Sequence, residues 1–178
     1  MELPALATVD QLGAWMQREP DELPTGAALV LDIASRIVRS EARQSFTRGT
    51  SSAVLHPDGG WVVLPQRPVV SVSEVRTGGQ LVPPDRWQLV RDRVRVLTGD
   101  QPVTVTFTHG YAAVPGDVLG LVLTVAARVL NNPADLRQES AGSVSVTYSA
   151  ETIGARLAPA DRDLLARYRR RVAVVPLL

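Results

Sequence analysis

The chain has 178 residues, of which 45% are apolar and 4% aromatic, enough for a folded core built mainly from Val, Leu and Ala. Its formal net charge is +1, so the chain as a whole has no bulk attraction to nucleic acid. Cysteine is absent, which excludes disulfides, thiolate metal sites and cysteine nucleophiles. All 19 basic residues are arginines, the side chain suited to bidentate interface contacts.

The sequence predicts neither a signal peptide at the N-terminus nor a membrane-spanning helix. The first ten residues, MELPALATVD, contain no basic region and no long apolar run, so a secretory signal is not expected. The longest apolar run in a predicted helix, residues 118–130, is interrupted by Gly120, Thr124 and Arg128. We therefore expect a soluble protein, made in a cytoplasm and without a membrane partner.

Two helices are predicted before residue 47. Thr8 and Gln11 have the spacing of a capping box, and the short helix that follows should end before Pro20. The second helix should begin at Pro24 and end near Gln44. Its period predicts one apolar face and an opposite charged side: the first with Gly26, Leu29, Ile33 and Ile37, the second with Asp32, Arg36, Arg39 and Arg43.

Between residues 47 and 109 the apolar period changes to two, which predicts strands. Asp58-Gly59-Gly60, Thr77-Gly78-Gly79 and the region of Asp92 each have the composition of a tight turn between strands. In the last predicted strand Val103, Val105 and Phe107 alternate with threonines, which is typical of a half-buried strand.

The remainder of the chain predicts two further helices separated by a polar segment. Asp117 lies where the third helix should begin, and Asn131-Asn132-Pro133 should end it. A loop with a short strand, Val144 to Tyr148, should follow. Pro159 has the position of a first helical residue in the last helix, with Asp161 near the positive end of the helix dipole and an arginine cluster after it.

These elements predict an α+β fold. A helical bundle formed by the N- and C-terminal helices, residues 1–46 and 110–178, should carry a central antiparallel β-rich insertion, residues 47–109. The helices of the two ends should pack together, because each alone has an unburied apolar stripe.

Residues with catalytic potential are few and scattered. His56 and His109 both lie beside strand ends, with no carboxylate cluster near them in the sequence. A metal site needs three or four ligands, and the spacing supplies none. Asp161 and Asp163 point to different sides of a helix. We therefore expect no enzyme activity, cofactor or metal.

The arginine cluster at the end of the chain has three interpretations. It can complement the negative end of the last helix and remain solvated. It can line a channel that faces DNA phosphates. It can also pair with acidic groups of a partner. The apolar segment behind it, VAVVPLL, indicates a partner surface.

Four segments in this order resemble the head-to-tail connector (adaptor) proteins of long-tailed bacteriophages. The first is LPQRPVVSVSEVRTGG; the second is the passage that contains Thr108-His109-Gly110-Tyr111 and Val114-Pro115, with Phe107 in the place of the usual Tyr. The third segment matches at Glu139, Ser140, Gly142, Ser145, Val146 and Tyr148. The last matches at Leu157, Asp161, Leu165, Tyr168, Arg169 and Arg170. The resemblance covers about residues 8–171.

The resemblance implies a structural protein of the virion neck. Such proteins form rings, usually of twelve copies, that dock under the portal protein, extend the DNA channel and present a platform to a stopper or tail-completion protein. In relatives the C-terminal segment reaches towards the portal. On this chain, that implies a portal-docking segment with Arg167, Arg169, Arg170, Arg171, Val174, Val175, Leu177 and Leu178.

Two other classes of function remain open from the sequence. A small DNA-binding or packaging-accessory module would use the arginine-rich last helix for recognition. An enzyme would need a cleft in the β-rich insertion, but no nucleophile and base are placed together by the sequence.

Overall fold

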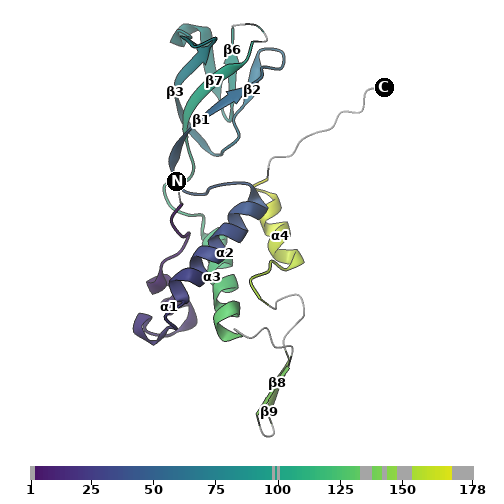
Figure 1. Cartoon of the computed structure of the whole chain (residues 1–178). Coiled ribbons are helices and arrows are strands. Elements are labelled where there is room, and N and C mark those ends of the chain that lie inside the picture. Colours follow the sequence, from purple (N-terminus) through teal and green to yellow (C-terminus); the bar gives the residue numbers. More distant parts are fainter. Residues whose placement is uncertain are drawn as a thin grey trace, which may run out of the picture. The chain divides into compact units, whose positions relative to one another are not determined.

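The computed structural model describes residues 3–97, 99, 101–132 and 154–169, together with two short strands at 138–141 and 144–147. The chain divides into two compact units. The helical unit comprises Met1–Gln44 and Val114–Leu178, and the β unit comprises Ser45–Ala113. Figure 1 shows the elements of each unit, and helices at both ends of the chain with strands between them confirm the predicted α+β class.

The helical unit is built from elements on both sides of the β unit in the sequence. Its elements are α1 (Val9–Met16), the 3-10 turn η1 (Pro20–Glu22), α2 (Ala27–Ala42), α3 (Gly116–Asn131) and α4 (Pro159–Ala166). α2 packs on both α3 and α4, and α1 packs on α3. The predicted packing of helices from the two ends is therefore confirmed.

The capping box of α1 is present as the sequence predicts. The Thr8 hydroxyl accepts the amide of Gln11 at 3.2 Å, and the Gln11 side chain accepts the amide of Thr8 at 2.9 Å. The segment before this cap lies on α2, where Ser35 Oγ accepts the amide of Leu6 at 2.9 Å. Arg39 Nη2 donates to the Pro4 carbonyl at 2.6 Å, which fixes the N-terminal segment to α2.

The buried face of α2 differs from the sequence prediction. Leu29 is 63% exposed and Ile33 40%, although both lie on the predicted apolar face, and Arg39, predicted on the opposite side, is buried. The face that packs in the unit is instead made of small and medium side chains: Ala27, Leu31, Ala34, Val38 and Ala42. The alanines of this face allow close packing of α2 on its neighbours.

α3 begins next to Asp117 and ends at Asn131, close to the predicted bounds. Its apolar residues lie on more than one side, and six of them are buried: Val118, Leu121, Val122, Leu123, Val125 and Ala126. A helix with so wide a buried surface is the central helix of its unit.

The β unit contains two small antiparallel sheets. The first has the order β1-β7-β3-β4, with β1 (Gly49–Leu55), β7 (Val103–His109), β3 (Val69–Thr77) and β4 (Gln80–Leu81). The second has the order β2-β6-β5, with β2 (Trp61–Val63), β6 (Arg93–Val96) and β5 (Trp87–Val90), the last preceded by the 3-10 turn η2 (Pro84–Arg86). One core of mainly valine side chains joins them: Val62, Leu64, Val75, Val82, Val94, Val96, Val103, Val105 and Phe107.

The central strand β7 confirms the predicted alternation. Val103, Val105 and Phe107 are fully buried, whereas the threonines between them are partly exposed. On that other face, hydroxyls of neighbouring strands meet, as between Thr106 and Ser52 at 3.3 Å. The alternation therefore separates an apolar core face from a face of small hydroxyl side chains.

Two of the three predicted turns join paired strands. β3 and β4 pair through Thr77 and Gln80, and β5 and β6 pair through Val90 and Arg93. The turn after Asp58 also forms, with two backbone hydrogen bonds between Asp58 and Trp61. The strands on either side of that turn do not pair, however, since β1 joins the first sheet and β2 the second. The hairpin predicted there is therefore wrong, because the chain uses the turn to change sheets.

A separate pair of short strands, β8 (Gln138–Ala141) and β9 (Val144–Thr147), lies between α3 and α4 in the sequence. β9 corresponds to the strand predicted from Val144. Within the described residues, no helix is long and apolar enough to cross a bilayer.

Candidate functional site

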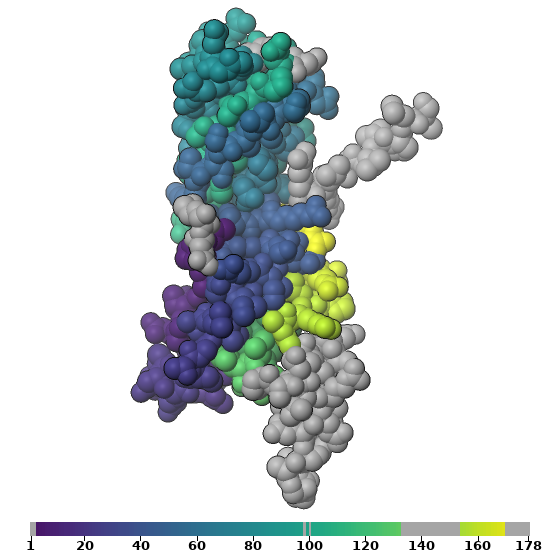
Figure 2. All heavy atoms as spheres, viewed as in Figure 1, coloured from purple at the N-terminus to yellow at the C-terminus, as the bar shows by residue number. Residues whose placement is uncertain are grey.

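The last helix and the residues that follow it form the candidate site. α4 ends at Ala166, so Arg167 and Arg169 lie just beyond the helix and not within it. The helix is held by an apolar contact at Leu165, which is fully buried, and by Leu157 just before it. Figure 2 shows α4 against the surface of α2.

The first turn of α4 is fixed by Asp161. One carboxylate oxygen accepts the amide of Ala158 and Nη1 of Arg128, both at 3.0 Å. Arg128 lies on α3, so this carboxylate both caps α4 and ties it to the central helix.

The residues after α4 are tied to α3 through Asp117. The Tyr168 hydroxyl donates to the two Asp117 carboxylate oxygens at 2.8 and 2.9 Å, and Arg167 forms an ion pair with the same carboxylate. The Arg167 guanidinium also lies over the Tyr168 ring, 5.1 Å from its centre. Asp117, in the first turn of α3, therefore binds two consecutive residues from the end of the chain.

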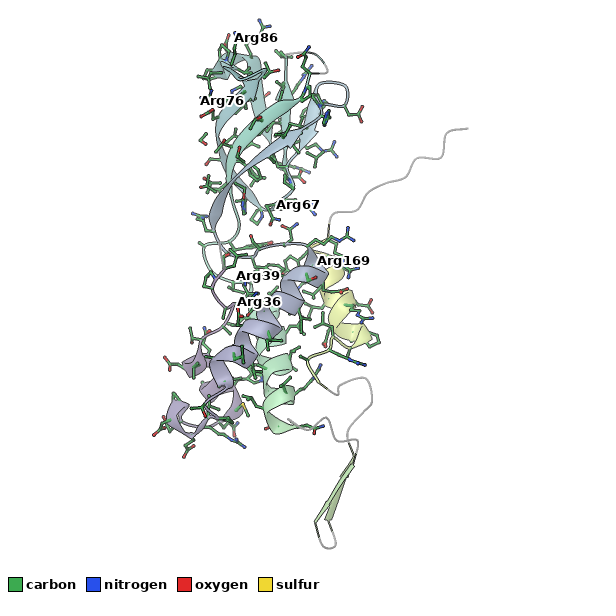
Figure 3. The ribbon with its side chains drawn as sticks, viewed as in Figure 1. Arg36, Arg39, Arg67, Arg76, Arg86 and Arg169 are labelled. Atoms are coloured by element: carbon green, nitrogen blue, oxygen red, sulfur yellow. The ribbon has the colours of Figure 1, made fainter. Side chains whose placement is uncertain are left out.

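Arg169 makes the corresponding contact with α2. Its Nε donates to the Glu41 carbonyl at 2.7 Å, and its guanidinium forms an ion pair with the Glu41 carboxylate. Figure 3 shows Arg169 beside the C-terminal end of α2. A polar surface pocket of about 310 Å³ lies at this point, lined by Ser40, Glu41, Arg43 and Arg169.

These contacts assign a structural role to part of the predicted docking cluster. Arg167 and Arg169 lie together at the end of α4, and each pairs with a carboxylate of its own chain. The other residues predicted for docking lie outside the described residues: Arg170, Arg171, Val174, Val175, Leu177 and Leu178. The sequence did not reveal Asp117 and Glu41 as partners, since they precede Arg167 and Arg169 by long stretches of chain.

The Thr-His-Gly-Tyr segment also contacts other residues of its own chain. The Gly110 amide donates to the Pro68 carbonyl at 2.9 Å, so two of the segments that carry the family resemblance touch each other. Tyr111 stacks on Phe46 with ring centres 6.3 Å apart and forms a bridge with Thr47. The segment thus joins the two points where the chain enters and leaves the β unit.

His109 is buried within that segment. Its Nε2 lies 2.8 Å from Ser51 Oγ, whereas Nδ1 is buried without a hydrogen-bond partner in the described part of the chain. Burial lowers the pKa of His109, which favours the neutral ring at neutral pH. His56 is exposed, and no group of three potential metal ligands occurs within the described residues.

Comparison with known proteins gives a likeness to solved structures. No family model matches the chain, and no curated protein matches it in sequence. A chain in the neck of a native gene transfer agent particle, solved with C12 symmetry, is 21% identical, with 98% of this chain and 99% of that chain covered and a TM-score of 0.57. A chain in the neck of an empty particle, solved with C6 symmetry, is 20% identical over 96% and 93% of the two chains, with a TM-score of 0.59.

The chain shares the fold of these neck chains. A chain of the native gene transfer agent virion gives the same result, with 20% identity, 96% and 93% coverage and a TM-score of 0.61. The likeness extends over both units, and it confirms at the level of the fold the resemblance to head-to-tail connector proteins. Two of the segments that carry the resemblance contact each other through Gly110 and Pro68, and the last one contacts α2 through Arg169 and Glu41.

Proposed function

We propose that the chain is a structural head-to-tail connector protein of a phage-like virion. It forms a ring under the portal, extends the DNA channel and gives the stopper or tail-completion protein its platform. The observation that carries the proposal is the likeness to neck chains over nearly the full length of both partners. The order of the four motif segments supports it independently.

The charge of the chain suits this role. A ring through which DNA slides should not hold the phosphates strongly, and a formal charge of +1 per chain limits non-specific attraction. Arg167 and Arg169 are further neutralised by Asp117 and Glu41. A ring of such chains therefore passes DNA without a strongly basic lumen.

The docking segment is proposed to be the end of the chain beyond Arg169. The contacts of Arg167 and Arg169 fix the point from which this segment starts. The residues that bind the portal are then Arg170, Arg171, Val174, Val175, Leu177 and Leu178. An apolar segment whose first residues are already fixed loses less conformational entropy on binding than one whose first residues are free to move.

Removal of residues 172–178 tests this role. We expect the shortened chain to fold but to be lost from portal-containing heads, measured by immunoblot of purified particles. The control carries the full tail with a Gly-Ser extension after Leu178, which should still attach. Equal attachment of the shortened and full chains would rule out the docking segment. Absence of the wild-type chain from particle necks in electron micrographs would rule out the connector function.

The alternative, a small DNA-binding module, is less well supported by the contacts. A recognition helix must present free side chains to a groove, but α4 is eight residues long, buries Leu165 and is followed by two paired arginines. Tight binding of the purified chain to duplex DNA, with a steep dependence on salt concentration, would favour that alternative.

A further inference from the structure

Helix α2 has a second apolar face that the described residues of its unit do not cover. Leu29 and Ile33 are largely exposed, and Val30 and Ile37 beside them are only partly buried. We call these four residues the α2 stripe. An exposed helix position normally carries a polar or charged side chain, and contiguous apolar residues on a surface indicate an interaction site.

The stripe lies on the side of α2 away from the core. Successive residues of a helix are rotated by about 100°, so Ile33 lies about 140–160° from Leu31 and Val38, which are buried. Asp32 and Arg36 form an ion pair at 2.8 Å along one border of the stripe. An apolar centre with a polar border is the usual composition of a protein interface.

A second apolar patch of the helical unit lies on a different element. Trp15 of α1 is 52% exposed, and its ring edge lies 4.0 Å from the position that a Cβ on Gly120 of α3 would occupy. Among the described residues of this unit, Trp15, Leu29 and Ile33 are the large apolar side chains with substantial exposure. Large exposed apolar side chains of this unit therefore occur on two elements, α1 with Trp15 and α2 with Leu29 and Ile33.

We propose that the α2 stripe of one copy packs against the Trp15 surface of the next copy in the ring. The proposal rests on the connector function above and names the lateral contact. Copies related by cyclic symmetry meet through two different surfaces of the same chain, and the necks that share this fold were solved with C12 and C6 symmetry. Exposed Trp in contact with aliphatic side chains is also a frequent source of binding energy.

Cross-linking in assembled particles tests the contact, because the chain has no cysteine of its own. Two single variants are made, Ala14→Cys beside Trp15 and Ile33→Cys in the stripe; both positions are exposed. Particles assembled with an equal mixture of the two are treated with a short bis-maleimide. We expect several-fold more covalent dimer from the mixture than from either variant alone.

The matched control replaces Ile33→Cys by Ala28→Cys, which is exposed on α2 but lies about 140° around the helix from Ile33. A mixture of Ala14→Cys and Ala28→Cys should give little dimer. Loss of the Ile33→Cys chain from necks that accept the Ala28→Cys chain would also support the contact.

Three results would overturn the proposal. Dimers from Ile33→Cys alone would show that like surfaces meet. Mixed particles that contain the chain but yield no dimer would exclude the contact and leave the connector function intact. Absence of the wild-type chain from necks would remove the connector function and this contact with it.

Discussion

The backbone around Gly110, in the Thr-His-Gly-Tyr segment, leaves no room for a side chain. Its φ of 89° lies in the region that favours glycine, and a Cβ placed there would be 2.1 Å from the Thr47 carbonyl oxygen. The contact is with backbone that itself bridges to Tyr111, so neither side can move aside easily.

Gly110→Ala should therefore destabilise the β unit by roughly 2–4 kcal/mol. Urea unfolding followed by intrinsic tryptophan fluorescence measures the change, since Trp61 and Trp87 lie in this unit. Gly116→Ala is the control, because a Cβ at Gly116 meets nothing within 4 Å and the residue begins a helix. Equal unfolding midpoints for the two variants would contradict the steric argument.

At the scale of the element, α4 depends on a few polar contacts because it has only eight residues. Asp161 makes two of them, to the Ala158 amide and to Arg128. Asp161→Ala should cost about 1–3 kcal/mol in the unfolding of the helical unit. Far-ultraviolet circular dichroism during urea unfolding measures this loss.

Asp163→Ala in the same helix is the matched comparison, because Asp163 is exposed. Its effect should stay within about 0.5 kcal/mol. A loss as large as that of Asp161→Ala would mean that helix propensity, and not the capping and ion-pair contacts, decides the stability of α4.

The elements also show how far the sequence predicts this fold. Alternation identified β7, the capping box identified α1, and the acidic Asp117 in the first turn identified the start of α3, because those signals are local. The face of α2 was mispredicted because apolar residues occur on two sides of the helix, and the period alone does not show which side packs in the unit. The site was predicted as an arginine cluster, but its carboxylate partners Asp117 and Glu41 could not be inferred, since they lie 51 and 128 residues from Tyr168 and Arg169.

At the scale of the whole molecule, the β unit has the properties of an independent folding unit. It has its own core, and its two ends are joined by the Thr47–Tyr111 bridge and the stacking of Phe46 on Tyr111. A fragment of residues 45–113 should therefore fold alone. Dispersed amide signals in its NMR spectrum would support this, whereas a collapsed spectrum would show that the helical unit is required.

The joined ends of the β unit also affect the order of folding. α2 and α3 make the main contact of the helical unit, yet about seventy residues of chain separate them. If the β unit folds first, the span to be closed shrinks to a few residues, which lowers the entropic cost of loop closure by about 2–3 kcal/mol. A ribosome would release the β unit before α3, so synthesis from the N-terminus already favours this sequence of events.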